Sequence, residues 1–134
     1  MTLNLASILI QVILLSTSLV MHELCHYLVA KLLGYQPGFN FEKFLSPTVS
    51  YVNKGNALKN SLISASAPVT LFFIGLMIPN KIIVLSLFKF ACLLNIFHLM
   101  PFCNDGQVIF VSLLSLLKRG IKQWSTNFFT YLAL

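Results

Sequence analysis

The chain has 134 residues, of which 57% are hydrophobic and only 9% are charged, and its mean hydropathy is +0.86. A water-soluble domain of this length needs more polar surface, so the composition excludes a soluble protein and predicts one integral membrane domain. The net charge of +6 comes from nine Lys and Arg residues against three acids. In a membrane protein this excess indicates topology and contact with the lipid bilayer. The sequence has no basic run interleaved with aromatic residues, so we expect no nucleic-acid partner.

The first hydrophobic segment, residues 3–33, is predicted to be one helix that crosses the membrane and ends at Gly34. Near its C-terminal end it carries a His-Glu-x-x-His motif. Residues four apart lie on one face of a helix, so His22 and His26 can bind one metal ion. Glu23 is placed to act as general base on a metal-bound water. A chance match is the alternative, but ionisable groups at membrane depth are costly without a purpose.

Residues 36–56 are predicted to form a small β-hairpin. Phe39 and Phe41 alternate with polar neighbours, and the alternation resumes at Val49 after a turn signal at Ser46-Pro47. Two roles are open for this hairpin. It can be a membrane-surface loop anchored by its aromatic residues, or its strand edge can hold an extended peptide through main-chain hydrogen bonds.

A second helix is predicted for residues 57–78, and small residues in its first half suit close helix packing. The third hydrophobic region, residues 82–118, is predicted to be a broken helix. A proline, an acid and a glycine follow one another within residues 98–106, and such unwound backbone is tolerated at membrane depth only inside protein. The last segment, residues 123–134, is too short to span and is predicted to lie at the interface.

These elements predict an all-α polytopic membrane protein, with about three transmembrane helical elements and a small β-hairpin between the first and second. We expect residues 1–134 to form a single membrane-embedded domain.

A catalytic zinc ion usually has three protein ligands and one open position, so a third ligand must come from outside the first helix. Of the three acids, Glu23 is the expected base and Glu42 lies in the hairpin. Asp105 alone lies in an apolar segment, where an unpaired carboxylate is costly, and it is the predicted third ligand. Three other side chains are alternatives: His98, Cys103 and Cys25. Of these, His98 is expected to orient a ligand or to be hydrogen-bonded inside the bundle.

The residues from His22 to Gly34 resemble the HExxHxxxAxxxG pattern of the site-2 protease family of intramembrane zinc metalloproteases. The later Asn95, Pro101 and Asp105-Gly106 resemble that family's Asn-Pro and Asp-Gly segment, and Ser66-Ala67-Pro68 is similar to a small-residue-Pro step on its intervening helix. Two details differ from the family pattern. Asn95 lies ten residues before Asp105, farther than is usual, and Gln107 stands where a second glycine is common.

The resemblance implies a minimal, single-domain protease with Zn²⁺ held by His22, His26 and Asp105 and with Glu23 as the catalytic residue. It would cleave a peptide bond in or near a membrane-spanning segment or in a small hydrophobic peptide. Its partner would be a membrane-embedded peptide or a single-span protein substrate. Three polar residues are expected to orient a ligand or to contact the substrate: Asn95, His98 and Asn104. The alternative function is a non-proteolytic metal-binding membrane protein with an immunity or chaperone role.

The basic residues predict the orientation in the cell membrane. One group flanks the first loop and another follows the broken helix: Lys31, Lys43, Lys54, Lys59, Lys118, Arg119 and Lys122. By the positive-inside tendency, we expect the N-terminus outside and both basic groups in the cytosol. The protein is then multi-pass, with its active site in the cytosolic half of the bilayer.

Overall fold

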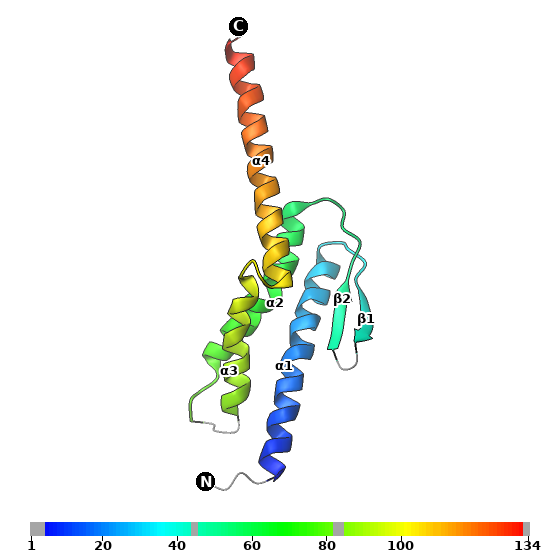
Figure 1. Cartoon of the computed structure of the whole chain (residues 1–134), viewed down its shortest axis with the longest axis vertical. Coiled ribbons are helices and arrows are strands. Elements are labelled where there is room, and N and C mark those ends of the chain that lie inside the picture. Colours follow the sequence, from blue (N-terminus) through cyan, green and yellow to red (C-terminus); the bar gives the residue numbers. More distant parts are fainter. Residues whose placement is uncertain (1–4, 44–45, 82–84, 133–134) are drawn as a thin grey trace.

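This computed structural model describes residues 5–43, 46–81 and 85–132 of the chain. Its elements are α1 (Leu5–Leu32), β1 (Gly38–Lys43), β2 (Ser46–Ser50), α2 (Ala57–Met77), α3 (Ser86–Leu94), the 3-10 helix η2 (Asn95–Leu99) and α4 (Asn104–Leu132). Three helical segments are long and apolar enough to cross a membrane: Leu5–Leu32, Ala57–Met77 and Ser86–Gly120. The fold is mostly helical with a small two-stranded antiparallel sheet, as predicted (Figure 1).

α1 buries one stripe in its C-terminal half, formed by Ser18, His22, His26 and Ala30. These residues recur every four positions, close to the helical period, so they share one face. Ser18 and Ala30 are small, which lets α2 approach closely, and Ala30 packs with Ile63 of α2 in the core. α1 therefore presents both histidines to the inside of the bundle.

Main-chain and basic groups hold the C-terminus of α1. Gly34 has a φ of +82°, a left-handed conformation that glycine adopts without strain, and Tyr35 N–H donates back into the last turn at 3.0 Å. The carbonyls of Gly34 and Leu33, just past the end of the helix, accept hydrogen bonds from the ammonium groups of Lys54 and Lys59, at 2.7 and 2.9 Å. Positive charge is favourable at this negative end of the helix dipole.

The predicted hairpin is confirmed: β1 and β2 pair antiparallel, with Phe39 opposite Val49. It lies along α1, where Tyr27 stacks on Phe39 with ring centroids 4.7 Å apart. The expected turn at Ser46-Pro47 is wrong, because both residues belong to β2 and the connection between the strands falls on residues 44–45, outside the described part. Pro47 is accommodated because the register shifts in this part of the ladder, and proline has no N–H for a regular pairing.

α2 lies at the centre of the bundle and contacts α1, α3, η2 and α4. Asn56 caps its first turn, and Ile63 and Leu71 are among its fully buried side chains. Pro68 lies inside the helix without ending it. The helix runs to Met77, one residue short of the predicted end.

The third hydrophobic element is interrupted, as predicted, although the irregular backbone begins already at Asn95. A turn separates η2 from α4, and in it Cys103 N–H donates to Met100 O at 3.0 Å. Gly106 packs directly on this turn, since a Cβ at that position would lie 1.8 Å from Met100 O. The new helix begins at Asn104, which places Asp105 in its first turn.

α4 is longer than predicted. The helix was expected to end near Lys118, but it continues to Leu132, so that boundary is wrong. The stretch after Gly120 contains no proline that would break a helix. Residues 123–132 extend α4, which projects beyond the other elements (Figure 1). The interfacial position of residues 123–134 stays a prediction.

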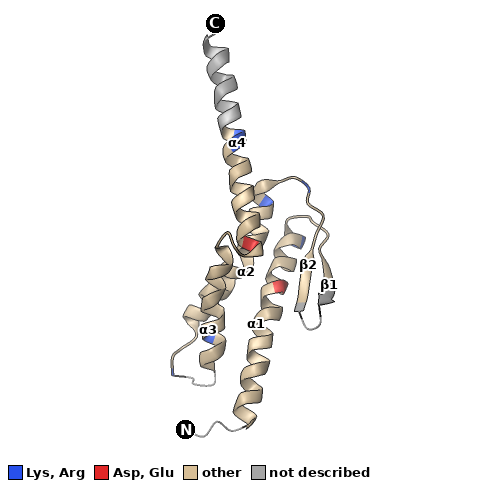
Figure 2. Ribbon diagram, viewed as in Figure 1, with Lys and Arg blue, Asp and Glu red and all other residues tan. Residues whose placement is uncertain are grey.

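Charges are distributed unevenly over the fold. Figure 2 shows one acidic position in α1 and one in α4, both at the middle of the bundle. Basic side chains gather where α1 ends. Lys54 and Lys59 bind carbonyls that directly follow this helix, and Arg119 of α4 donates to Gly55 O at 3.5 Å. This end of the bundle is the one predicted to face the cytosol, and the orientation itself stays a prediction.

Candidate metal centre

Three donor side chains from two distant helices converge inside the bundle. His22 Nε2 lies 3.1 Å from Asp105 Oδ2, and His26 Nε2 lies 3.3 Å from Asp105 Oδ1. The two histidine Nε2 atoms are themselves 3.1 Å apart. Both histidine side chains are 9% exposed and that of Asp105 is 18% exposed. The three predicted ligands therefore form one largely buried group that could hold a metal ion.

The tautomer of each histidine follows from its other ring nitrogen. His26 Nδ1 faces the carbonyl of Ile63 at 2.8 Å, and a carbonyl can only accept. His22 Nδ1 faces Asn95 Oδ1 at 2.7 Å, and this amide is oriented by donating through Nδ2 to Ala91 O at 2.8 Å. Both Nδ1 atoms therefore carry the hydrogen and donate.

In the neutral imidazoles both Nε2 atoms are then bare acceptors. Their lone pairs point toward each other and toward the carboxylate of Asp105, an arrangement that is repulsive by itself. A positive charge is required where the three atoms meet, either a shared proton or a metal ion. Metal-binding histidines commonly donate their second ring N–H to a carbonyl or amide oxygen, as both do here.

The donor atoms lie close enough to one another to share one metal ion. In a tetrahedral zinc site with bonds of about 2.0–2.1 Å, neighbouring ligand atoms lie about 3.3 Å apart. The two Nε2 atoms are 3.1 Å apart, and they lie 3.1 and 3.3 Å from different oxygens of Asp105. One ligand atom from each of the three residues lies within 4.8 Å of the other two. Two imidazoles and one carboxylate also leave one position of a tetrahedron without a protein ligand.

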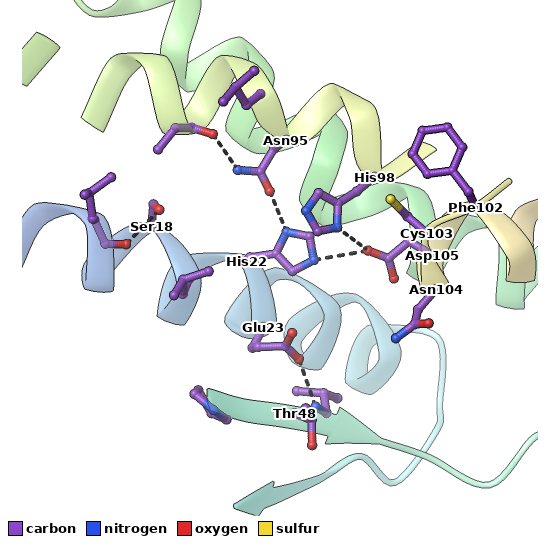
Figure 3. Close-up of a pocket in the computed structure, with 16 residues that line it drawn as sticks. Ser18, His22, Glu23, Thr48, Asn95, His98, Phe102, Cys103, Asn104 and Asp105 are labelled. Atoms are coloured by element: carbon purple, nitrogen blue, oxygen red, sulfur yellow. Dashed lines mark hydrogen bonds and ion pairs between the residues drawn. The ribbon is translucent and has the colours of Figure 1, made fainter. Parts of the chain in front are cut away.

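Glu23 stands beside this group without belonging to it. Its Oε2 accepts a hydrogen bond from the main-chain N–H of Val49 in β2 at 2.8 Å. Figure 3 shows its carboxylate between the His22 and Asp105 group and the β2 strand. Glu23 can therefore act on a molecule in the pocket while leaving the three donor atoms free for an ion.

A cavity of about 780 Å³ opens on the donor group. Its polar side includes His22, Glu23, Asp105 and Thr48 of β2. Apolar side chains of α1, of α3 and of the turn before α4 line much of the rest: Leu15, Leu19, Ala91, Leu94 and Phe102. The cavity is large enough for a few residues of an apolar peptide beside the donor group.

The three residues expected to orient a ligand or contact a substrate all line this cavity. Asn95 holds the ring of His22, as described above. The side chain of His98 is 49% exposed, and its Nδ1 lies 3.7 Å from Asp105 Oδ2, too far for a hydrogen bond (Figure 3). Asn104 lies at the start of α4 with its side chain in the cavity wall (Figure 3).

The two cysteine alternatives are outside the donor group. Among the described residues, the group that could hold an ion consists of His22, His26 and Asp105. Cys103 lines the cavity and Cys25 does not, and both are only partly buried. Sequence reasoning missed two main-chain partners, the carbonyl of Ile63 and the amide of Val49, because every residue has these groups and no sequence signal marks them.

Compared with protein-family models, with curated proteins and with solved structures, the chain has no match.

Proposed function

We propose that the protein is a zinc-dependent intramembrane metalloprotease of the site-2 protease type. The observation that carries this proposal is the convergence of two bare histidine nitrogens and a carboxylate, with a glutamate beside them that is not needed as a ligand. A site built only to store or carry a metal ion needs the three donors and has no use for a base next to them.

Zinc is the ion that fits this donor set best. Two imidazoles and one carboxylate with an open fourth position are the ligand pattern of catalytic zinc sites. A harder ion such as Mg²⁺ or Ca²⁺ prefers oxygen ligands and a higher coordination number. When bound, zinc would polarise the scissile carbonyl and lower the pKa of a water molecule.

The side chains of the chain supply the remaining chemistry. Glu23 would accept a proton from the attacking water and pass it to the leaving amine. Asn95 and the Ile63 carbonyl keep His22 and His26 in the tautomer that offers Nε2 to the ion. The largely buried position of Asp105 keeps its carboxylate aimed at the same point.

The substrate would be a membrane-embedded peptide or a single-span protein. Three segments long and apolar enough to span a bilayer surround the site, and much of the cavity lining is apolar. A peptide must be extended to expose its bond to a base and an ion, so a helical substrate would unwind locally on entering this cavity.

The variant Glu23→Gln tests this proposal, with zinc content and cleavage measured on the same sample. The zinc content should stay at the wild-type level, because Glu23 is not one of the three metal donors. The rate of cleavage should fall by a factor of about 10²–10⁴. Peptides that co-purify with the variant, identified by mass spectrometry, supply the substrate for the assay. If the variant cleaves peptides as fast as the wild type, the protease proposal is overturned. The metal-binding alternative with an immunity or chaperone role is then favoured.

A further inference from the structure

The hydrogen bond between Val49 N–H and Glu23 Oε2, 2.8 Å long, joins the expected base to the hairpin. In an antiparallel pair, residues alternate between exchanging bonds with the partner strand and pointing both main-chain groups toward the other edge. Val49 N–H is directed at α1, so Val49 is one of the outward-pointing residues of β2. The outer edge of β2 at this position therefore faces Glu23 and the cavity (Figure 3).

This outer edge is short of hydrogen-bond donors. The outward positions of β2 alternate, so the neighbour of Val49 on this edge is Pro47, which has no N–H. The N–H of Val49 is already taken by Glu23. An extended peptide added to this edge would find carbonyl acceptors but no free donor at these two positions, which removes half of the ladder that strand addition requires.

The hairpin is fixed to α1 at the same place. Glu23 and Tyr27 are four residues apart on α1 and so lie on one face. Tyr27 stacks on Phe39 at 4.7 Å, Phe39 pairs with Val49 across the sheet, and Val49 binds Glu23. The four residues form a closed circuit of contacts, so the position of the Val49 amide is set in part by the stacking of Tyr27 on Phe39, neither of which lines the cavity.

We propose that the main-chain amide of Val49 is the positioning group for the catalytic base, and that β2 serves Glu23 instead of an incoming substrate strand. One carboxylate oxygen is held by the amide, and the second stays free for the water that is to be deprotonated. Of the two roles open for the hairpin, neither membrane anchoring nor strand addition accounts for this bond. The inference rests on the proposed protease function.

The test replaces Val49 by proline, which removes the main-chain N–H. The strand pairing does not use this N–H, so the β-ladder should be preserved. Val49→Ala is the matched control, because it shortens the side chain and keeps the N–H. We expect kcat to fall about 10- to 100-fold in Val49→Pro with KM and zinc content unchanged, as for the loss of one hydrogen bond to a charged group. Val49→Ala keeps the amide and should therefore lose far less kcat than Val49→Pro. Equal kcat in both variants, or a raised KM in Val49→Pro, would overturn the inference.

Combining Val49→Pro with a change at Glu23 shows whether the Val49 amide acts through Glu23. Glu23→Asp shortens the side chain by one methylene, so its carboxylate no longer reaches Val49. Adding Val49→Pro to Glu23→Asp should then cause no further loss of kcat, since the two changes remove the same interaction. A full additional loss would mean that Val49→Pro acts on the substrate or on the hairpin itself.

If Val49→Pro does not fold, an NMR measurement that needs no catalytic activity tests the same hydrogen bond. In wild type, the amide proton of Val49 should resonate downfield in an NMR spectrum because it binds a charged oxygen, and it should move upfield in Glu23→Ala. An unchanged amide shift would overturn the inference. Absence of peptide cleavage by the wild type would instead remove the proposed function and leave the amide result standing, so the two failures are distinguishable.

Discussion

His22 and Asn95, 73 positions apart in the sequence, are joined by a hydrogen bond of 2.7 Å between Nδ1 and Oδ1. The same asparagine donates to Ala91 O, which fixes the direction of its amide. The interrupted third element therefore does more than deliver Asp105: its 3-10 segment also determines which nitrogen of His22 is left for an ion.

Replacing Asn95 by alanine should weaken zinc binding about 10- to 100-fold, because the His22 ring loses the acceptor that fixes its tautomer. Isothermal titration with zinc in detergent measures this change. Ser18→Ala is the control, since Ser18 lies on the same buried stripe but its hydroxyl donates to Leu15 O at 2.9 Å and not to the donor group. Equal zinc affinity in Asn95→Ala and wild type would contradict the role of Asn95.

Asp105→Ala should lose zinc and activity together, because two nitrogens alone are a poor zinc site. His98→Ala should keep most of the zinc, since His98 Nδ1 lies outside the donor group. X-ray absorption of the zinc-loaded wild type should show two imidazole nitrogens and an oxygen at about 2.0–2.2 Å. If His98→Ala is metal-free while Asp105→Ala binds one zinc per chain, the site uses three histidines.

Gly106→Ala should disrupt the junction between η2 and α4. The new Cβ would overlap the main-chain oxygen of Met100, which cannot move without shifting the turn that carries Asp105. We expect a loss of several kcal/mol in the free energy of unfolding, or no folded protein, together with loss of zinc binding. Gly120→Ala in the same helix meets nothing within 4 Å and should be neutral or stabilise by about 0.5–1 kcal/mol. Thermal unfolding in detergent compares the two.

The orientation is tested by accessible cysteines in a chain whose three native cysteines are replaced. A cysteine at Lys54 should react with a membrane-impermeant reagent only after the membrane is opened, because the basic end of the bundle is predicted to be cytosolic. A cysteine at Lys81, which follows the opposite end of α2, should react from outside. Labelling of position 54 alone from outside would reverse the assignment.

Several features of this protein follow from the sequence alone because they depend on local geometry. The four-residue spacing of His22 and His26 places both on one helical face whatever surrounds them, and the length and apolarity of three segments suffice for spanning helices. The Pro101 to Gly106 stretch predicted an interruption because these residues disfavour a regular helix. Where the signal is weak, the prediction failed: Ser46-Pro47 belongs to a strand, and α4 continues well past Lys118.

Only the tertiary structure decided how the site is completed. Asp105 could be selected from the sequence because acids are scarce, but its approach to both Nε2 atoms depends on the packing of α4 on α2, which also packs against α1. The Ile63 carbonyl that fixes His26 and the Val49 amide that holds Glu23 are main-chain groups, identical at nearly every residue. Their role comes from their position in space, which is set by the packing of α2 and of the hairpin on α1. Local sequence does not determine that packing, so these two groups could not be predicted from it.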